Sequence, residues 1–222
     1  MTYMHNDSTI TGGRRPPGRP KDMAHLHRRR EDILECATKL FASRGFRNTD
    51  LKSVADQLGV AKGTIYNYFD TKNDLFFACL AYGMQRMRAS IDHETADATS
   101  TFQLLERGMH AYFAFFDANP EVVELLVQER AEFKSRETST YFQHVEQRKS
   151  RWIEIYETLR RDGIFRDIPG EKIFEFVNHQ VYGALFANYF SGRKQSLQEL
   201  TAPILDIFYR GVLSEKEQIQ GT

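Results

Sequence analysis

Apolar residues recur at intervals of three and four along most of this chain, the spacing that places side chains on one face of an α-helix. The clearest stripes lie in segments 27–44, 71–90, 102–116, 138–161 and 171–190. No stretch of useful length alternates apolar and polar residues as a half-buried strand does. The pattern therefore predicts an all-α fold.

Two shorter stripes follow the first long one. The first is formed by Leu51, Val54, Ala55 and Leu58, and the second by Ile65 and Phe69, four residues apart. Gly59 separates them at a position where helices commonly end, because glycine adopts the left-handed conformation without penalty. Two short helices joined by a glycine-containing turn predict a helix-turn-helix.

The second short helix carries an unusual outer face. With Ile65 and Phe69 buried, helical geometry points Gly63 and Asn67 away from the core. The side chains that flank them are those of Lys62, Thr64, Tyr66 and Tyr68. Asparagine can make a bidentate contact to adenine, and Thr, Tyr and Lys can reach phosphates or base edges, so this face suits a DNA groove.

Two helix starts add candidate phosphate contacts. Thr49 lies where the first short helix begins, and Thr71 with Asp74 forms a capping box that has Lys72 beside it. Helix N-termini favour anions, so we expect Thr49 and Lys72 to contact phosphates. The alternative is a pair of ordinary core helices whose tyrosines only pack.

The segment Val60-Ala61-Lys62-Gly63-Thr64-Ile65-Tyr66-Asn67-Tyr68-Phe69, with Lys72 and Leu75 after it, resembles the DNA-binding signature of the TetR family of bacterial transcriptional regulators. Thr49, Val54-Ala55 and Gly59-Val60 fit the same pattern in register. The resemblance covers residues 30–76. It implies an N-terminal three-helix DNA-binding domain followed by a C-terminal helical bundle that binds an effector and dimerises.

Charge is distributed unevenly. The whole chain of 222 residues has 30 basic and 30 acidic residues, but residues 1–80 hold 13 Lys and Arg against 9 Asp and Glu. Residues 81–222 hold 17 against 21. A basic end on an acidic body orients the molecule towards nucleic acid.

The N-terminal 25 residues are poor in apolar side chains, and we expect a disordered basic arm. Within it, the segment 14–21 looks like the AT-hook type of minor-groove arm, with cations at Arg14, Arg15, Arg19 and Lys21. Arginines enter narrow A·T-rich minor grooves, where the potential is most negative. The alternative is a solvated tail that raises non-specific affinity alone.

The organisation predicted is therefore an arm (1–25), a DNA-binding domain (26–75), an effector-binding and dimerisation domain (76–215) and a flexible tail (216–222). The segment 171–190 is apolar nearly all round, so it must be covered on both sides. The resemblance implies that it pairs with the last helix against a second copy. The expected interface is Val181, Gly183, Ala184, Ala187, Ile204, Ile207 and Phe208. The alternative is that these residues belong to the monomer's own core.

Aromatic side chains are concentrated in the C-terminal part. The resemblance implies that some of them line an inducer cavity, and the expected set is His110, Phe113, Phe116, Trp152, Tyr156, Phe176, His179 and Tyr182. Core packing is the alternative for each one. We expect no cofactor and no metal, because the two cysteines, Cys36 and Cys79, have no metal-site spacing and are expected to be small buried hydrophobes.

No catalytic motif is present, and neither a signal peptide nor a run of 18 apolar residues occurs. We expect no membrane association and a cytoplasmic protein that is nucleoid-associated when bound to DNA. The function predicted is a homodimeric repressor that an apolar or aromatic effector releases from a palindromic operator. The alternatives are an activator or ligand-independent regulator of the same fold, an architectural DNA-coating protein, and a small-molecule carrier with a vestigial DNA unit.

Overall fold

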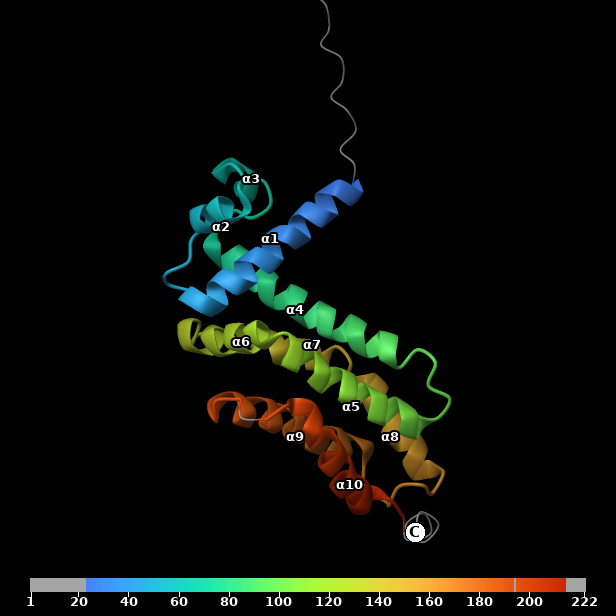
Figure 1. The fold of residues 1–222 in the computed structure, drawn as a ribbon. Helices are drawn as coiled ribbons and strands as arrows, with labels where there is room; N and C mark the ends of the chain where they lie inside the picture. Colours follow the sequence, from blue (N-terminus) through green and yellow to red (C-terminus); the bar gives the residue numbers. More distant parts are fainter. Residues whose placement is uncertain (1–22, 194, 215–222) are drawn as a thin grey trace, which may run out of the picture.

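The computed structural model describes residues 23–193 and 195–214, which are almost entirely helical (Figure 1). The helices are α1 (Met23–Arg44), α2 (Leu51–Leu58), α3 (Lys62–Tyr66), α4 (Lys72–Glu94), α5 (Thr101–Ala118), α6 (Pro120–Glu132), α7 (Thr140–Glu146), α8 (Lys149–Arg161), α9 (Gly170–Phe190), the short 3₁₀ helix η1 (Leu197–Leu200) and α10 (Thr201–Val212). These residues form no strand; an isolated antiparallel bridge joins Phe165 to Leu213. The all-α prediction is confirmed.

Helices α1 to α3 and the first part of α4 form the N-terminal unit, at the top of Figure 1. The apolar stripes predicted from the sequence meet in its centre. The most deeply buried side chains there are Ile33, Leu34, Phe41, Val54, Ile65, Leu75 and Phe76. The core is partly aromatic, and Phe41 and Phe76 meet edge to face with ring centroids 5.1 Å apart.

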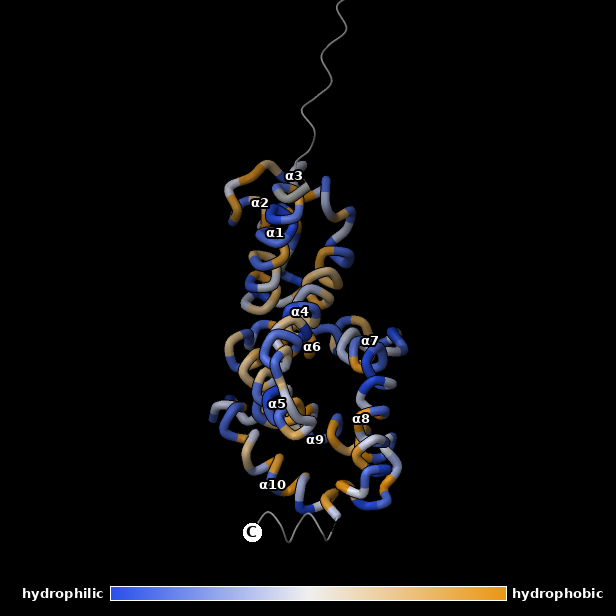
Figure 2. Tube along the Cα trace, turned by 90° about the vertical axis from the view of Figure 1, so that its right-hand side faces the viewer, coloured by the Kyte–Doolittle hydropathy of each residue, from blue (hydrophilic) through white to orange (hydrophobic). Residues whose placement is uncertain are grey.

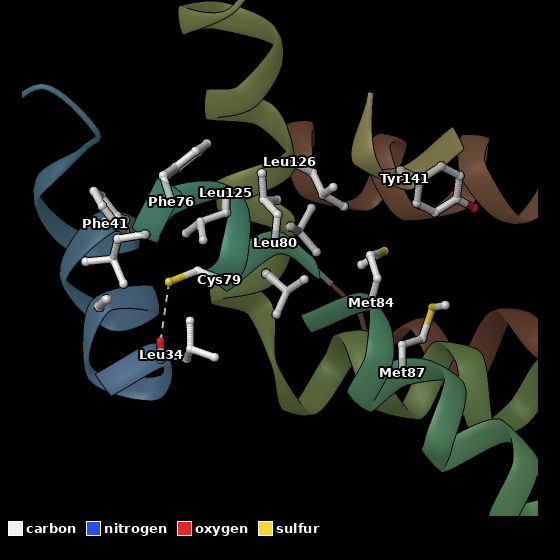
Figure 3. Packing of buried hydrophobic residues seen from close by; sticks show 14 of the residues in the cluster. Leu34, Phe41, Phe76, Cys79, Leu80, Met84, Met87, Leu125, Leu126 and Tyr141 are labelled. Atoms are coloured by element: carbon white, nitrogen blue, oxygen red, sulfur yellow. Dashed lines mark hydrogen bonds between the residues drawn. The ribbon is translucent and has the colours of Figure 1, made fainter. Parts of the chain in front are cut away.

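Helix α4 joins this unit to the rest of the molecule. It starts at a capping box in which the Thr71 hydroxyl accepts from the Asp74 backbone N–H at 3.1 Å and the Asp74 carboxylate accepts from the Thr71 N–H at 3.0 Å. This confirms the predicted box. The helix continues four residues beyond the predicted end at residue 90. Figure 3 shows its buried side chains in a row, from Phe76 beside α1 to Met87 near the C-terminal helices.

The segment 138–161 is two helices, not the single one predicted. Helix α7 ends at Glu146 and α8 begins at Lys149. The buried carboxylate of Glu129, on α6, accepts hydrogen bonds from the Thr140 N–H at 3.0 Å and the Thr140 hydroxyl at 2.9 Å. The carboxylate thereby holds the first turn of α7 against α6. The chain has no glycine or proline at the break, so the apolar pattern in the sequence does not indicate that the helix ends there.

Figure 2 shows the C-terminal helices from the side, turned by 90° from the view of Figure 1. Helices α4 and α5 lie on one side, α7 and α8 on the other, and α9 and α10 close the end. A second apolar cluster, centred on Tyr156, Phe165, Ile173 and Phe208, joins α8, α9 and α10. Within the described chain no helix is both long and apolar enough to cross a membrane.

Candidate nucleic-acid interface and ligand cavity

Local interactions fix both ends of α2. Asp50 caps α2, because its carboxylate accepts from the Ser53 N–H at 2.7 Å, and the Ser53 hydroxyl lies 3.2 Å from the Asp50 N–H. Gly59 ends the helix with φ of 65°, the left-handed region that a residue with a Cβ enters at a cost. The two short helices are thus held in a helix-turn-helix.

Helix α3 presents its polar face outwards. Ile65 is fully buried and Phe69 is 4% exposed, while Lys62, Gly63 and Asn67 are exposed. Tyr66 is 45% exposed, and the Lys62 ammonium lies 5.3 Å from the centre of its ring. Thr64 and Tyr68 are half-buried, and Tyr68 lies two residues after the end of the helix, beyond its C-cap Asn67. The structure therefore brings these six predicted residues onto or beside one surface.

The structure places Thr49 away from that surface. Its side chain is 1% exposed, and its hydroxyl lies within hydrogen-bonding distance of the backbone oxygens of Leu40 at 3.2 Å and Gly45 at 3.0 Å. The chain turns back over the end of α1 here, and the hydroxyl is used to satisfy carbonyls that the helix end leaves unpaired. The Thr49 hydroxyl is not available to a phosphate in this arrangement.

Lys72 also has partners inside the molecule. Its ammonium donates to the backbone oxygens of Phe46 at 3.0 Å and Arg47 at 3.3 Å, and lies 4.4 Å from the centre of the Phe46 ring. The side chain is half-buried and fixes the loop between α1 and α2. The sequence pattern predicts a functional role for this lysine but does not show that the loop between α1 and α2 contacts its ammonium group.

The predicted arm residues Arg14, Arg15, Arg19 and Lys21 lie outside the described residues. Within the described part of α1, the Arg30 guanidinium lies 5.2 Å from the centre of the Phe69 ring, just after the end of α3.

A cavity of about 140 Å³ lies among the C-terminal helices. Its lining residues come from helices α4, α5, α7, α8, α9 and α10 and from the junction between α7 and α8. Its lining residues are Met87, Ile91, Leu105, Gly108, Met109, Tyr112, Tyr141, His144, Val145, Arg148, Trp152, Tyr156, Phe174, Val177, Asn178, Val181, Leu205 and Phe208. The wall is mostly apolar with a few polar groups, as small-molecule sites are.

Two of the eight predicted effector residues, Trp152 and Tyr156, line this cavity. The others lie elsewhere. Phe113 and Phe116 are buried in the core, His110 and His179 are exposed, Phe176 is 45% exposed, and Tyr182 packs against Tyr141 and Phe186. Adjacent helical residues point about 100° apart, so the turn of α5 that brings Tyr112 to the cavity sends Phe113 away from it.

Sequence reasoning missed the polar end of the cavity. Tyr141, His144 and Arg148 follow one another at spacings of three and four, so they share the cavity side of α7 and its junction with α8. This spacing was the available signal. Conversely, Val181 and Phe208, expected at a dimer interface, are buried in the monomer and line the cavity.

The polar end has distinct electrostatics. The hydroxyls of Tyr112 and Tyr141 lie 2.9 Å apart, and burial raises the pKa of Tyr141 to about 12 and that of Tyr112 well above its usual value. Burial lowers the pKa of His144, and the positive charges of Arg88 and Arg148 lower it further. A guanidinium nitrogen of Arg148 lies 2.7 Å from the Asp92 carboxylate. Burial opposes ionisation of Asp92, but Arg148 and Arg88 outweigh it and hold its pKa below the usual range.

The outer face of α9 and α10 is apolar and uncovered. Phe176, Phe190 and Ile207 are 45%, 72% and 66% exposed. Of the predicted interface residues, Gly183 and Ala187 are exposed, and Ala184 and Ile204 are half-buried on the same side. These residues also line a shallow depression between the two helices. In the described part of the chain, no three His, Cys, Asp or Glu side chains are grouped so that they could hold a metal ion.

Comparison with known proteins agrees with this architecture. Residues 33–79, which contain the helix-turn-helix, match the model of the bacterial regulatory proteins of the tetR family. The chain belongs to the tetR family. This family is one of transcriptional regulators rather than enzymes, and the chain is a DNA-binding regulator.

Relatives match over much of the chain. The transcriptional repressor KstR2 of Mycobacterium tuberculosis is 25% identical over 199 residues, which cover 86% of this chain and 96% of that protein. The transcriptional activator FasR of Mycolicibacterium smegmatis is 25% identical over 130 residues, 58% of this chain and 59% of FasR. The solved structure of the M. tuberculosis ketosteroid regulator KstR2 superposes with a TM-score of 0.64 at 22% identity, over 84% of this chain and 96% of that one.

Proposed function

We propose that this tetR-family member is a homodimeric repressor that leaves a palindromic operator when a small molecule occupies the cavity. One observation carries the proposal. Helix α4 contributes Leu75 and Phe76 to the core of the helix-turn-helix unit and Met87 and Ile91 to the cavity wall. A ligand that prefers one position of α4 shifts the population towards that position and so changes the placement of α3.

Contacts between α6 and the N-terminal unit give a second mechanical link. The side-chain amide of Gln128 donates to the backbone oxygen of Phe41 at 2.9 Å. The Arg47 guanidinium donates to both carboxylate oxygens of Glu132, at 3.1 and 2.9 Å. Because both partners sit at the end of α1 and the loop after it, the helix-turn-helix rests on α6 as well as on α4.

In this proposal residues 26–75 read the DNA and residues 76–215 bind the effector and dimerise. The exposed apolar face of α9 and α10 supports dimerisation, because patches of this kind mark protein interfaces. A two-fold dimer presents two copies of α3, which fit half-sites about 34 Å apart on a palindromic operator. The protein then acts in the cytoplasm, on the nucleoid while it is bound to DNA.

The direction of regulation has two candidates. The KstR2 relatives are named repressors and support repression, whereas FasR is named an activator and supports the alternative. An architectural DNA-coating role would leave the cavity among the C-terminal helices without use.

Selection of bound sequences from random duplex DNA at physiological salt tests the proposal. We expect enrichment of one short palindrome, followed by its release when a cavity ligand is added. Salt-sensitive binding without any enriched sequence would instead support the architectural role. A reporter gene placed behind the selected operator separates repression from activation.

A further inference from the structure

Most polar groups of the cavity are gathered on one side, where they mostly donate hydrogen bonds; the other polar lining residues are Tyr156 on α8 and Asn178 on α9. We call Tyr141, His144 and Arg148, with Tyr112 opposite Tyr141, the donor edge. The other walls are formed by side chains such as Leu105, Phe174, Leu205 and Phe208. The cavity is therefore amphipathic, with a polar end along α7 and an apolar body.

Several donors of this edge have no acceptor inside the described protein. The Nε2 atom of His144 is buried and has no hydrogen-bond partner there. One proton of the Tyr112–Tyr141 pair bridges the two hydroxyls, so the second phenol proton is left over. One guanidinium nitrogen of Arg148 donates to Asp92, and its remaining N–H groups have no acceptor in the described part of the chain. Buried polar groups without partners are costly, so a ligand that supplies acceptors is favoured.

The charges nearby favour an anion. Arg88 and Arg148 outnumber the single carboxylate of Asp92, which both of them contact. His144 adds no charge of its own at neutral pH because its pKa is lowered, but its neutral ring can donate from Nε2. None of the lining residues is acidic, so the wall offers a cation no carboxylate to pair with.

The size of the cavity limits how large an apolar group a ligand can place in it. Its volume is about 140 Å³, close to the roughly 150 Å³ of an engineered apolar cavity that holds one benzene molecule. A single ring or a short branched chain fits this space, and a fused polycyclic body exceeds it.

We propose that the cavity binds a monocarboxylate with a ring-sized apolar body, with the carboxylate against the donor edge and the ring against Trp152, Phe174 and Phe208. The carboxylate accepts from His144 Nε2, from Arg148 and from the spare phenol proton. This inference rests on the proposed role of the cavity as the effector site, and names the chemistry of its ligand.

The test uses the fluorescence of Trp152, the single tryptophan of the chain, which lines the cavity. The full-length protein is titrated at pH 7.5 with benzoate, the neutral analogue benzamide, the cation benzylammonium and the long-chain acid decanoate. We expect benzoate to change the emission with a Kd at least about tenfold below that of benzamide, since hydrogen bonds to charged groups are the stronger ones. Benzylammonium should leave the emission unchanged, and decanoate should bind more weakly than benzoate.

Variants locate the carboxylate. His144→Leu should raise the Kd for benzoate about tenfold and Arg148→Lys by less, since lysine keeps the charge. The matched control is His110→Leu, an exposed histidine on α5 outside the cavity, which should leave the Kd unchanged. Circular dichroism checks the fold of each variant. If His144→Leu does not fold, His144→Gln is used instead, because it keeps a side-chain N–H. Its Kd for benzoate should lie between the Kd of the wild-type protein for benzoate and that of the wild-type protein for benzamide.

Several outcomes would overturn the inference: equal or tighter binding of benzamide or benzylammonium, binding of decanoate without benzoate, no response to any probe, or an equal rise in Kd in the His110 variant. Operator affinity is measured separately. Benzoate binding that leaves operator affinity unchanged contradicts the proposed effector control but keeps this inference. Release of the operator by a neutral or cationic ligand of the cavity supports the proposed effector control but contradicts this inference.

Discussion

Gly63 lies on the outer face of α3, and a Cβ built on it meets no atom within 4 Å. Its φ is not in the left-handed region, so neither packing nor backbone geometry inside this protein requires glycine there. We infer that the absence of a side chain serves close approach of the helix to DNA.

Gly63→Ala tests this inference. Alanine should stabilise the protein slightly, by about 0.5–1 kcal/mol, because it is favoured over glycine inside a helix. Affinity for the selected operator should fall about tenfold, which corresponds to about 1.4 kcal/mol. Thermal unfolding and fluorescence anisotropy measure the two effects. Gly211→Ala, at another open helical glycine on α10, is the matched control and should leave DNA affinity intact.

The two cysteines differ more than their sequence setting suggests. Cys79 is 1% exposed, its sulfur lies 3.6 Å from the Leu34 carbonyl oxygen (Figure 3), and burial raises the pKa of its thiol to about 12. Cys36 is half-buried, and burial raises its pKa as well. The expectation of a small buried hydrophobe is confirmed for Cys79 and only in part for Cys36.

A thiol reagent should therefore modify native Cys36 first, because thiolate reactivity requires access as well as ionisation. Dithionitrobenzoate added to the folded protein should release one equivalent before the second. The Cys36→Ser variant should lose the earlier phase, while Cys79→Ser should retain it. Equal rates for the two thiols in folded protein would show that α1 and α4 separate readily.

At the scale of elements, the contact between α4 and α6 depends on a small residue. A Cβ at Gly83 would lie 2.9 Å from Val122 Cγ1 and 3.2 Å from Cγ2. The two helices are thus as close as glycine allows, at the point where α4 passes from the helix-turn-helix unit towards the cavity. We expect this contact to transmit displacement, because close-packed interfaces shift as units and do not deform gradually.

Gly83→Ala should destabilise the protein by about 1–3 kcal/mol, the usual range for overpacking in a core. Val122→Ala in the same chain should recover part of that stability, because it removes the two methyl groups that the new Cβ would meet. Urea denaturation of the two single variants and the double variant gives the coupling. Additive effects would mean that the helices move apart without resistance.

On the scale of the whole molecule, the exposed apolar face of α9 and α10 predicts a dimer. Ile207→Glu places a charge where a partner copy would bury it, so the dimer should dissociate at micromolar concentration. Analytical ultracentrifugation measures the shift, and operator binding should weaken in parallel. Ala131→Glu, on the outer side of α6 away from that face, is the control. A dimer unaffected by Ile207→Glu would place the interface elsewhere.

The basic arm is expected to act on affinity for all sequences. Deleting residues 1–22 should weaken binding to any duplex and flatten the salt dependence by about 0.9 log unit of slope for each phosphate that the arm neutralises. Titrations of both proteins between about 50 and 300 mM salt measure the two slopes. An unchanged slope would show that the arm does not touch phosphates.

The sequence by itself determined the helix-turn-helix and the all-α class. Local interactions dominate there: Gly59 ends α2, Thr71 and Asp74 cap α4, and the stripe of Ile65 and Phe69 sets which face of α3 is outward. Each of these signals acts within a few residues, so the linear pattern contains it.

Only the tertiary structure decided the cavity. Whether Tyr112 or Phe113 faces it depends on how α5 is rotated against α4, and Val181 and Phe208 line it because α9 and α10 each present two apolar faces. The first turn of α7 is held by Glu129, which is 11 residues from Thr140 in sequence. Apolar periodicity predicts that a helix face is buried, but it does not predict which helix covers that face, because the hydrophobic effect is non-directional. The partner of each face is settled by how the helices pack together.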